Sequence, residues 1–269
     1  MGVTLQFTRL QPFGAEIDRD LSEPFGPSEA WHFKQLFDEH KLILARGQAL
    51  TMERQQELCA LIGPILLRKG EDGTMTNQAG PSSASAYCWH SDAAYTEYPF
   101  DALALHALDV VDDASSTLFA SAEDGWDALP GNLRQALETR EQEMIAPHYT
   151  RLDKRSCDTR DPERMKQGIM PAVYVNPHSG RTCVWVGEMN TVQLLGMEWE
   201  QSRDLLHEVY DHLYAPTRVL EHKWRQGDFI VWDNIALQHA RPDMSDVGKR
   251  LLQRVIVGTQ GEVPHYEGD

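Results

Sequence analysis

Cysteine is scarce in this chain, and no segment has the length and apolar character of a membrane span. The 269 residues include four cysteines, which are widely separated and form no C-x-x-C pair. This spacing argues against a zinc knuckle or a dithiol redox motif and favours reduced thiols inside a cell. No apolar run approaches the roughly 18 residues of a membrane-spanning helix, and the N-terminus lacks the pattern of a signal peptide. We therefore expect a cytoplasmic protein with no membrane partner.

Basic residues are few relative to acidic ones. The chain has 25 Lys and Arg against 41 Asp and Glu, a formal net charge of -16 and a pI near 5.0. A polyanion would be repelled by this charge, so no nucleic-acid partner is expected. An anionic small molecule would have to be bound by a local group of arginines, because the overall field does not attract it.

The regular alternation of strands and helices that a doubly wound parallel sheet needs is also absent. Apolar residues recur at helical spacing over 28–40, 51–63 and 198–214. Short apolar runs bounded by turn residues predict strands over 41–45, 102–108, 117–120, 171–175, 181–186, 218–224, 229–232 and 251–257. This pattern predicts a mainly β fold with flanking helices, built on a double-stranded β-helix, which is a jelly-roll or cupin-like core.

No linker or change of composition divides the sequence. We therefore expect a single domain over residues 1–269. Two polar, weakly periodic segments interrupt the predicted strands, near 70–85 and 144–170. We expect these insertions to act as lids over a site.

A candidate metal site begins in the segment Cys88-Trp89-His90-Ser91-Asp92. Residues two apart on an extended segment point to the same side, so His90 and Asp92 can reach one ion. A carboxylate, an imidazole and a second histidine from elsewhere form the facial triad of iron(II) oxygenases, which leaves three positions for substrates and dioxygen. The H-x-D pattern alone is common and does not identify a metal.

The third ligand must come from another histidine. His239 follows the apolar strand 229–232 and a turn-rich segment, where the mouth of a barrel is expected. His106 and His222 lie in strand-like segments and remain its main rivals. Five further histidines lie in predicted helices (His32, His207 and His212), in a hairpin turn (His178) or in the C-terminal tail (His265), where solvation or packing explains them more simply.

Arg250 and Arg254 are candidates for binding an anion. They are four residues apart on a predicted strand and therefore share one face. An arginine that faces the inside of an apolar barrel needs an anionic partner, and its planar fork suits a carboxylate. The alternative is that either arginine pairs with one of the many acidic side chains of the chain.

Five segments together carry a resemblance to a known family. They are Gly14-Ala15-Glu16-Ile17-Asp18, His40 to Gln48, Trp89-His90-Ser91-Asp92, Tyr174 to Glu188, and Gly227-Asp228 through Trp232-Asp233-Asn234 to Gln238-His239. In this combination the chain resembles the taurine dioxygenase family, which includes the 2,4-dichlorophenoxyacetate-degrading enzymes and uses iron(II) and 2-oxoglutarate. The resemblance covers nearly the whole chain.

The resemblance implies roles for five residues. His90, Asp92 and His239 would bind Fe(II), and Arg250 and Thr117 would bind the distal carboxylate of 2-oxoglutarate. With dioxygen as the other co-substrate, the enzyme would oxidise, most simply hydroxylate, a small organic substrate and release succinate and CO2. Members of the family often form dimers or tetramers, so a homo-oligomer is also implied.

The resemblance further suggests what kind of substrate binds. Arg254 matches an arginine that can bind an anionic group of the substrate, so we expect an anionic small molecule. Arg68, a further candidate for binding the substrate, matches a substrate-contacting histidine of the taurine-specific members, and Ala86 stands where those members have a polar residue. Taurine itself is therefore not the expected substrate. The remaining candidates for lining the pocket are Tyr87, Tyr95 and Asn190, each of which could instead pack in the core.

Two other functions fit the same pattern. A zinc-dependent hydrolase could use the same three ligands, but it would not require Arg250 and Thr117. A non-catalytic small-molecule-binding or sensor protein could use the same scaffold, because a fold does not determine a function. Succinate formation that depends on dioxygen separates the predicted enzyme from both.

Overall fold

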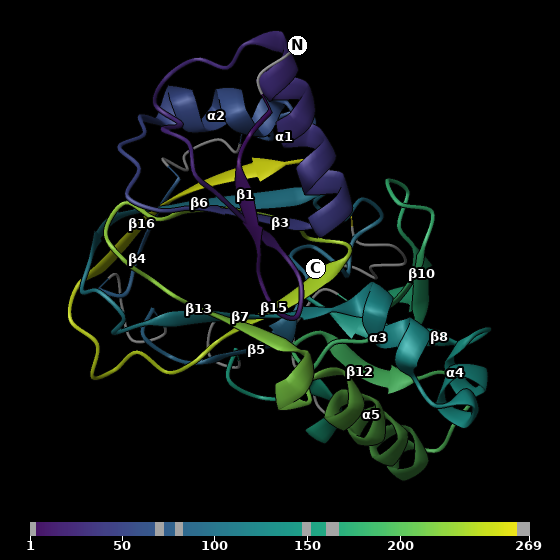
Figure 1. The fold of residues 1–269 in the computed structure, drawn as a ribbon. Helices are drawn as coiled ribbons and strands as arrows, with labels where there is room; N and C mark the ends of the chain where they lie inside the picture. Colours follow the sequence, from purple (N-terminus) through teal and green to yellow (C-terminus); the bar gives the residue numbers. More distant parts are fainter. Residues whose placement is uncertain (1–3, 68–72, 79–82, 147–151, 160–166, 263–269) are drawn as a thin grey trace.

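Two β-sheets face each other in the computed structural model, which describes residues 4–67, 73–78, 83–146, 152–159 and 167–262 (Figure 1). In spatial order, the larger sheet consists of β1 (Phe7–Arg9), β2 (Ala15–Ile17), β3 (Leu42–Ala45), β14 (Phe229–Asp233), β6 (Ala102–Val110), β16 (Arg250–Val257) and β4 (Thr74–Thr76). The smaller sheet consists of β13 (Val219–Lys223), β7 (Ser116–Ser121), β15 (Leu237–Arg241) and β5 (Tyr87–His90). Within these two sheets, only the β2–β3 pair is parallel among the described strands.

Strand β3 illustrates why these strands are apolar throughout. All four of its residues are buried, and alternate side chains point to opposite faces of the sheet. Leu42 and Leu44 pack between the two sheets, in one cluster with Trp232. Ile43 and Ala45 pack on the other face, under two N-terminal helices. A strand that is covered on both faces must be apolar at every position.

Helices α1 (Pro27–His40) and α2 (Met52–Ala60) cover the outer face of the larger sheet (Figure 1). The α2 helix begins directly after Thr51, within the predicted helical segment 51–63. The Thr51 hydroxyl oxygen accepts a hydrogen bond of 3.1 Å from the backbone N–H of Arg54, which satisfies a donor that the first helical turn leaves unpaired.

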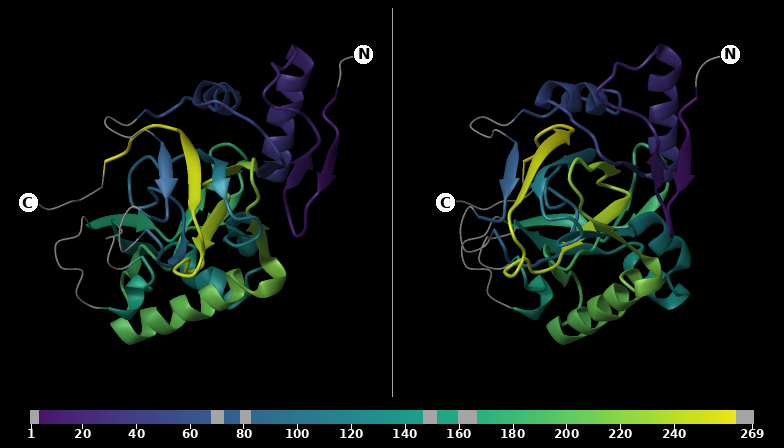
Figure 2. Two further views of the ribbon diagram at one scale, coloured as in Figure 1. Left: turned by 90° about the vertical axis from the view of Figure 1, so that its left-hand side faces the viewer. Right: turned by 60° about the vertical axis from the view of Figure 1, so that its left-hand side comes forward.

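A second layer, with α5 (Trp199–Leu213), α3 (Ala122–Ala128) and α4 (Gly131–Leu137), packs against the smaller sheet. It lies on the opposite side of the molecule from α1 and α2 (Figure 2). The other elements of this layer are the sheet β12 (Thr191–Leu194), β8 (Glu141–Ile145) and β9 (Gln167–Pro171), the hairpin β10 (Val173–Val175) and β11 (Thr182–Val184), and the short helices η1 (Ser156–Asp158) and η2 (Pro216–Arg218). Both sheets are thus sandwiched between helical layers.

The predicted fold class is confirmed: the chain is mainly β, with flanking helices and a jelly-roll core. Several strands were not predicted, and one of them, β15, lies beside the candidate metal ligands. Sequence reasoning treats 233–238 as turn-rich, and the Asp233 carboxylate does form a turn by accepting the backbone N–H groups of Ile235 and Ala236. The chain then returns immediately to an extended conformation as β15, which lies between β7 and β5.

The two predicted insertions are partly ordered into strands. β8 and β9 pair with each other at the two ends of 144–170, and β4 adds an edge to the larger sheet within 70–85. The remainder of these insertions includes 70–72, 79–82, 147–151 and 160–166, which lie outside the described residues. The lids and the single domain therefore stay predictions. Among the described residues, no helix is long and apolar enough to cross a membrane.

Candidate metal centre

Three predicted ligands converge at one end of the space between the two sheets. His90, Asp92 and His239 offer donor atoms that all lie within 4.8 Å of one another. Asp92 Oδ1 lies 3.3 Å from His90 Nε2 and 3.9 Å from His239 Nε2. The two imidazole centroids are 4.2 Å apart, with ring planes inclined by 47°. Two nitrogens and one carboxylate oxygen at this spacing fit a single metal ion held from one side.

Strands β5 and β15 bring the two histidines together, since His239 pairs with His90 in antiparallel register. Asp92 lies two residues beyond the end of β5, and Asn234 fixes its backbone there. The Asp92 N–H donates to Asn234 Oδ1 at 2.8 Å, and Asn234 Nδ2 donates to the Asp92 carbonyl at 2.9 Å. His90 Nδ1 lies 2.7 Å from the Cys88 carbonyl oxygen. This contact turns His90 Nε2 toward the site, as expected for a metal ligand.

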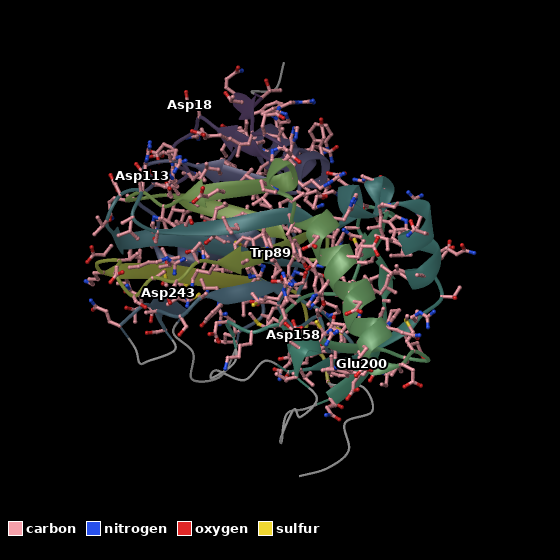
Figure 3. All side chains as sticks on the ribbon, turned by 90° about the horizontal axis from the view of Figure 1, so that it is seen from below. Asp18, Trp89, Asp113, Asp158, Glu200 and Asp243 are labelled. Atoms are coloured by element: carbon pink, nitrogen blue, oxygen red, sulfur yellow. The ribbon has the colours of Figure 1, made fainter. Side chains whose placement is uncertain are left out.

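The outer faces of the same two strands are supported by residues next to α5. Trp89 stacks on Tyr214, with centroids 4.4 Å apart and planes inclined by 6°, and Figure 3 places Trp89 beside that helix. The Tyr214 hydroxyl donates to Gln238 Oε1 at 2.6 Å. Because Trp89 and Gln238 directly precede His90 and His239, these contacts stabilise the strands that carry the ligands.

The charges at the site suit a metal cation. Burial alone would raise the pKa of Asp92, but a hydrogen bond with His90 and the positive charge of Arg254 hold that pKa well below its usual range. Arg254 Nη1 lies 4.0 Å from Asp92 Oδ2. Burial, and then the neighbouring His90, lower the pKa of His239 to about 3. At neutral pH, His239 is therefore neutral and Asp92 is ionised, which are the forms that bind metals.

Neither rival histidine joins the three ligands. His106 Nε2 lies 3.0 Å from the carbonyl oxygen of Gln48. His222 Nε2 lies 3.3 Å from Asp228 Oδ2, and both side chains are buried. These contacts give both histidines a packing role apart from the metal ligands, so His239 is the third ligand that the geometry favours.

A second group of three donors lies between η1 and α5. Its members are Cys157, Asp158 and His207, whose donor atoms also lie within 4.8 Å of one another. Burial, and then the charge of Asp158, raise the pKa of the Cys157 thiol to about 12, which disfavours the thiolate that a metal needs. His207 Nε2 already pairs with Asp158 Oδ1 at 2.8 Å. This group is the natural control for a metal-binding measurement.

A cavity of about 90 Å³ adjoins the three ligands, and Thr117 and Arg250 line it with them. Thr117 Oγ1 accepts a hydrogen bond of 3.0 Å from the indole N–H of Trp224. Arg250 is 3% exposed, and its Cζ lies 5.5 Å from the centroid of the Trp224 ring. Its Nε has no hydrogen-bond partner within the described part of the chain. Burial, and then the charge of Arg241, lower the pKa of Arg250 to about 9.

Arg254 and Tyr87 line the same cavity, whereas Tyr95 and Asn190 do not. Asn190 is buried elsewhere, and its Nδ2 donates to the carbonyl of Ile145 at 3.0 Å. Tyr95 packs against a separate apolar cluster. Arg68 lies outside the described residues. The structure thus brings two of the five predicted substrate residues to the cavity.

Arg241 is a cavity residue that the sequence reasoning missed. It follows His239 by two positions on β15, so both side chains point to the inside of the barrel. Its Cζ lies 3.7 Å from the centroid of the Tyr87 ring, and one terminal nitrogen donates to the carbonyl of Ser85 at 2.5 Å. Its spacing from His239 would have identified it, had β15 been predicted as a strand.

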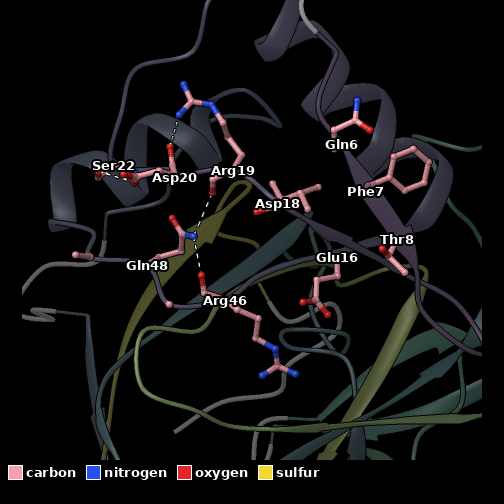
Figure 4. A pocket seen from close by; sticks show the side chains of 13 residues that line it. Gln6, Phe7, Thr8, Glu16, Asp18, Arg19, Asp20, Ser22, Arg46 and Gln48 are labelled. Atoms are coloured by element: carbon pink, nitrogen blue, oxygen red, sulfur yellow. Dashed lines mark hydrogen bonds between the residues drawn. The ribbon is translucent and has the colours of Figure 1, made fainter.

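A larger groove, of about 880 Å³, lies near the N-terminus between β1, β2 and residues 46–49 (Figure 4). Its polar groups largely bind one another. Arg19 Nη1 donates to the Asp20 carbonyl at 2.7 Å, and Gln48 Nε2 donates to the Arg46 carbonyl at 2.8 Å. None of the three ligands lines this groove. The smaller cavity is therefore the candidate active site, despite the greater volume of the groove.

Two histidines and one aspartate on a jelly-roll core, beside a cavity lined by arginines, define the class of facial-triad metal oxygenases. The chain belongs to the taurine catabolism dioxygenase TauD, TfdA family, whose model matches residues 6–256. The predicted family and the predicted enzyme class are both confirmed.

Individual relatives agree with this assignment. The chain is 24% identical to the alpha-ketoglutarate-dependent 2,4-dichlorophenoxyacetate dioxygenase of Cupriavidus pinatubonensis, over 88% of this chain and 91% of that protein. It is 26% identical to the alpha-ketoglutarate-dependent sulfate ester dioxygenase of Pseudomonas putida, over 84% and 78%. The fold is shared with a solved taurine dioxygenase from Burkholderia xenovorans, which superimposes with a TM-score of 0.76 at 22% identity, over 97% of this chain and 93% of that chain.

Proposed function

We propose that this chain is an iron(II)- and 2-oxoglutarate-dependent dioxygenase that hydroxylates a small anionic organic substrate. The observation that carries the proposal is that the three metal ligands share one cavity with Thr117, Arg250 and Arg254. The named relatives act on a phenoxyacetate and on sulfate esters, and both kinds of compound are small and anionic.

His90, Asp92 and His239 would hold the metal. Their donor set of two imidazole nitrogens and one carboxylate oxygen suits iron(II) and leaves coordination positions open. When bound, iron and 2-oxoglutarate together supply the oxidative chemistry, in which dioxygen is consumed and succinate and CO2 are released. The role of the protein residues would be to bind, orient and enclose the reactants.

Thr117 and Arg250 would bind the distal carboxylate of 2-oxoglutarate. The buried guanidinium of Arg250 has an Nε donor without a partner among the described residues, and a carboxylate is the partner that fits its planar fork. Because Thr117 Oγ1 already accepts the indole N–H of Trp224, its own hydroxyl hydrogen is available to donate. Both groups can therefore donate to one carboxylate.

Arg254 would bind the anionic group of the substrate. It lies four residues from Arg250 on β16, about 13 Å along the strand, and it lies next to Asp92 at the metal end. The cavity has three arginines, Arg241, Arg250 and Arg254, against one carboxylate. This local excess of positive charge can attract two anionic reactants even though the whole chain is acidic.

The test is substrate-stimulated turnover of 2-oxoglutarate by the iron-loaded chain. We would screen small carboxylates, sulfonates and sulfate esters, each beside an uncharged analogue with the same body. We expect succinate formation that requires dioxygen and that the anions stimulate. In an Arg254→Gln variant, the KM for the substrate should rise about tenfold or more, while the KM for 2-oxoglutarate should not change. Stimulation by uncharged compounds alone would contradict the anion assignment. Product without dioxygen would favour the zinc hydrolase, and the absence of turnover would favour a binding protein.

A further inference from the structure

The strand register places three side chains, those of Tyr87, Arg241 and Thr117, at one level of the smaller sheet. On β15, His239 lies opposite Phe119 of β7 and Ala240 lies opposite Leu118, so the next pair along is Arg241 and Thr117. Arg241 lies opposite Tyr87 on its other side. Strand β15 lies between β5 and β7 in the sheet, so Arg241 lies between Tyr87 and Thr117.

This level lies at a defined distance from the metal ligands. His90, His239 and Phe119 form the neighbouring row across the same three strands. Two residues along a strand span about 6.6 Å, so Arg241 and Thr117 lie roughly that far along the sheet from the metal ligands. One extra residue in β5 between the two rows lets Tyr87 and His90 both face the cavity although they are three positions apart. The two rows therefore match the two ends of a short dicarboxylic acid.

The guanidinium of Arg241 is held in place by two neighbours, and its Nε–H is available to donate to a ligand. The Tyr87 ring supports the guanidinium at 3.7 Å, and the Ser85 carbonyl accepts one terminal N–H. Its Nε is buried without a hydrogen-bond partner within the described part of the chain. A guanidinium held in this way loses little freedom when it binds a planar anion.

The charge of Asp243 offsets the positive charge of Arg241 only in part, and no carboxylate is among the groups that act on Arg250. Both residues are at most 9% exposed. No carboxylate of the described residues forms an ion pair with either. Two unpaired buried cations in one cavity are costly, because each loses its hydration and repels the other. An anion between them would relieve both effects.

We propose that Arg241 is a second arginine for the distal carboxylate of 2-oxoglutarate, and that with Arg250 it selects a 2-oxo acid that ends in a carboxylate. This inference rests on the proposed function, because it assumes that Thr117 and Arg250 bind the same group. Arg250 approaches from the larger sheet and Arg241 from the smaller one, so the carboxylate is held from both walls of the cavity.

The experiment compares two ligands in the absence of oxygen. Calorimetric titration of the Co(II)-loaded chain with 2-oxoglutarate and with 2-oxopentanoate isolates the distal carboxylate, because the second acid has a methyl group in its place. In the Arg241→Gln variant, we expect the affinity for 2-oxoglutarate to fall about tenfold or more, while the affinity for 2-oxopentanoate changes less than about twofold. Arg241→Lys keeps the charge without the fork and should lose preference to an intermediate degree.

The control is Arg254→Gln, which removes a cavity arginine at the metal end and should leave the ratio of the two affinities unchanged. An Arg241→Gln chain that binds both acids as the unaltered chain does, or that loses both equally, would overturn the inference. If the unaltered chain itself fails to prefer 2-oxoglutarate, the proposed co-substrate is wrong and the failure does not concern Arg241. Cobalt stoichiometry and circular dichroism of each variant show whether it is folded.

Discussion

His239 has the two properties that a metal ligand of this kind needs. Its Nε2 faces Asp92, and Trp232 packs edge-on against its ring with centroids 5.2 Å apart. This apolar setting keeps the imidazole neutral and fixes its orientation. The same burial leaves few alternative groups within reach of a metal ion, so the loss of His239 should not be compensated.

Replacement of His239 by alanine should therefore abolish metal binding at the site. Changes to residues that merely orient a ligand cost up to about 100-fold in metal affinity, and the loss of a ligand itself should cost at least as much. Titration with Co(II) should show one ion per unaltered chain and none with His239→Ala. The matched control is His207→Ala, which removes a histidine from the second donor group and should still bind one ion. If His207→Ala abolished binding and His239→Ala did not, the metal would instead be bound by Cys157, Asp158 and His207.

Thr117 has a structural role as well as the proposed binding role. Its hydroxyl accepts the buried indole N–H of Trp224. Thr117→Val keeps the shape but leaves that donor unpaired, so the free energy of unfolding should fall by about 1–3 kcal/mol, and 2-oxoglutarate should bind more weakly. Thr117→Ser retains the hydroxyl and should preserve both properties. Urea unfolding and ligand titration of the two variants measure this, and equal behaviour of valine and serine would refute the role of the hydroxyl.

The turn before β14 contacts the segment that follows β3 through a backbone hydrogen bond. Gly227 has a φ of 77°, and its carbonyl accepts the backbone N–H of Gln48 at 2.6 Å. A Cβ at Gly227 would lie 2.8 Å from the Gln48 carbonyl oxygen. The turn therefore requires glycine both for its conformation and for the close approach of another backbone segment.

Gly227→Ala should lower the free energy of unfolding by more than about 2 kcal/mol, because strain and a backbone clash add together. Gly180 is the matched control: its φ is 71°, but a Cβ there would meet no atom within 4 Å. Gly180→Ala should cost only the conformational part, about 1 kcal/mol. Chemical denaturation of both variants checks the difference, and similar costs would show that the approach of Gln48 does not matter.

The elements also show what the sequence could and could not predict. Strand β3 was predicted because a strand covered on both faces is apolar at every position. The spacing of His90 and Asp92 identified two ligands, although Asp92 lies beyond the strand and depends on Asn234 for its position. Arg241 was missed because the segment before it was interpreted as turn-rich, so its two-residue spacing from His239 was not recognised as the spacing of a strand.

At the scale of the whole molecule, buried histidines make stability depend on pH. Burial lowers the pKa of His106 and, despite the nearby carboxylate of Asp228, also that of His222. In the unfolded chain, histidine titrates near pH 6.5. Below that pH the unfolded state takes up protons that the folded state does not, so acidification favours unfolding.

The free energy of unfolding should therefore fall as the pH is lowered from about 7 to about 5. Each of the two histidines can contribute up to about 1.4 kcal/mol per pH unit until its pKa in the folded state is reached. Urea unfolding of the metal-free chain at several pH values measures the slope. The double variant His106→Gln, His222→Gln should have a shallower slope, and a slope as steep as that of the unaltered chain would contradict this explanation.

The central claim is that one cavity holds both the metal and 2-oxoglutarate. The most direct measurement is the visible absorption of the chain after anaerobic addition of iron(II) and then 2-oxoglutarate, since a 2-oxo acid chelated to iron(II) has a weak charge-transfer band. The account predicts a band with the unaltered chain that saturates at one equivalent of iron and is lost in His239→Ala. No band with the unaltered chain, or an unchanged band in His239→Ala, would contradict it.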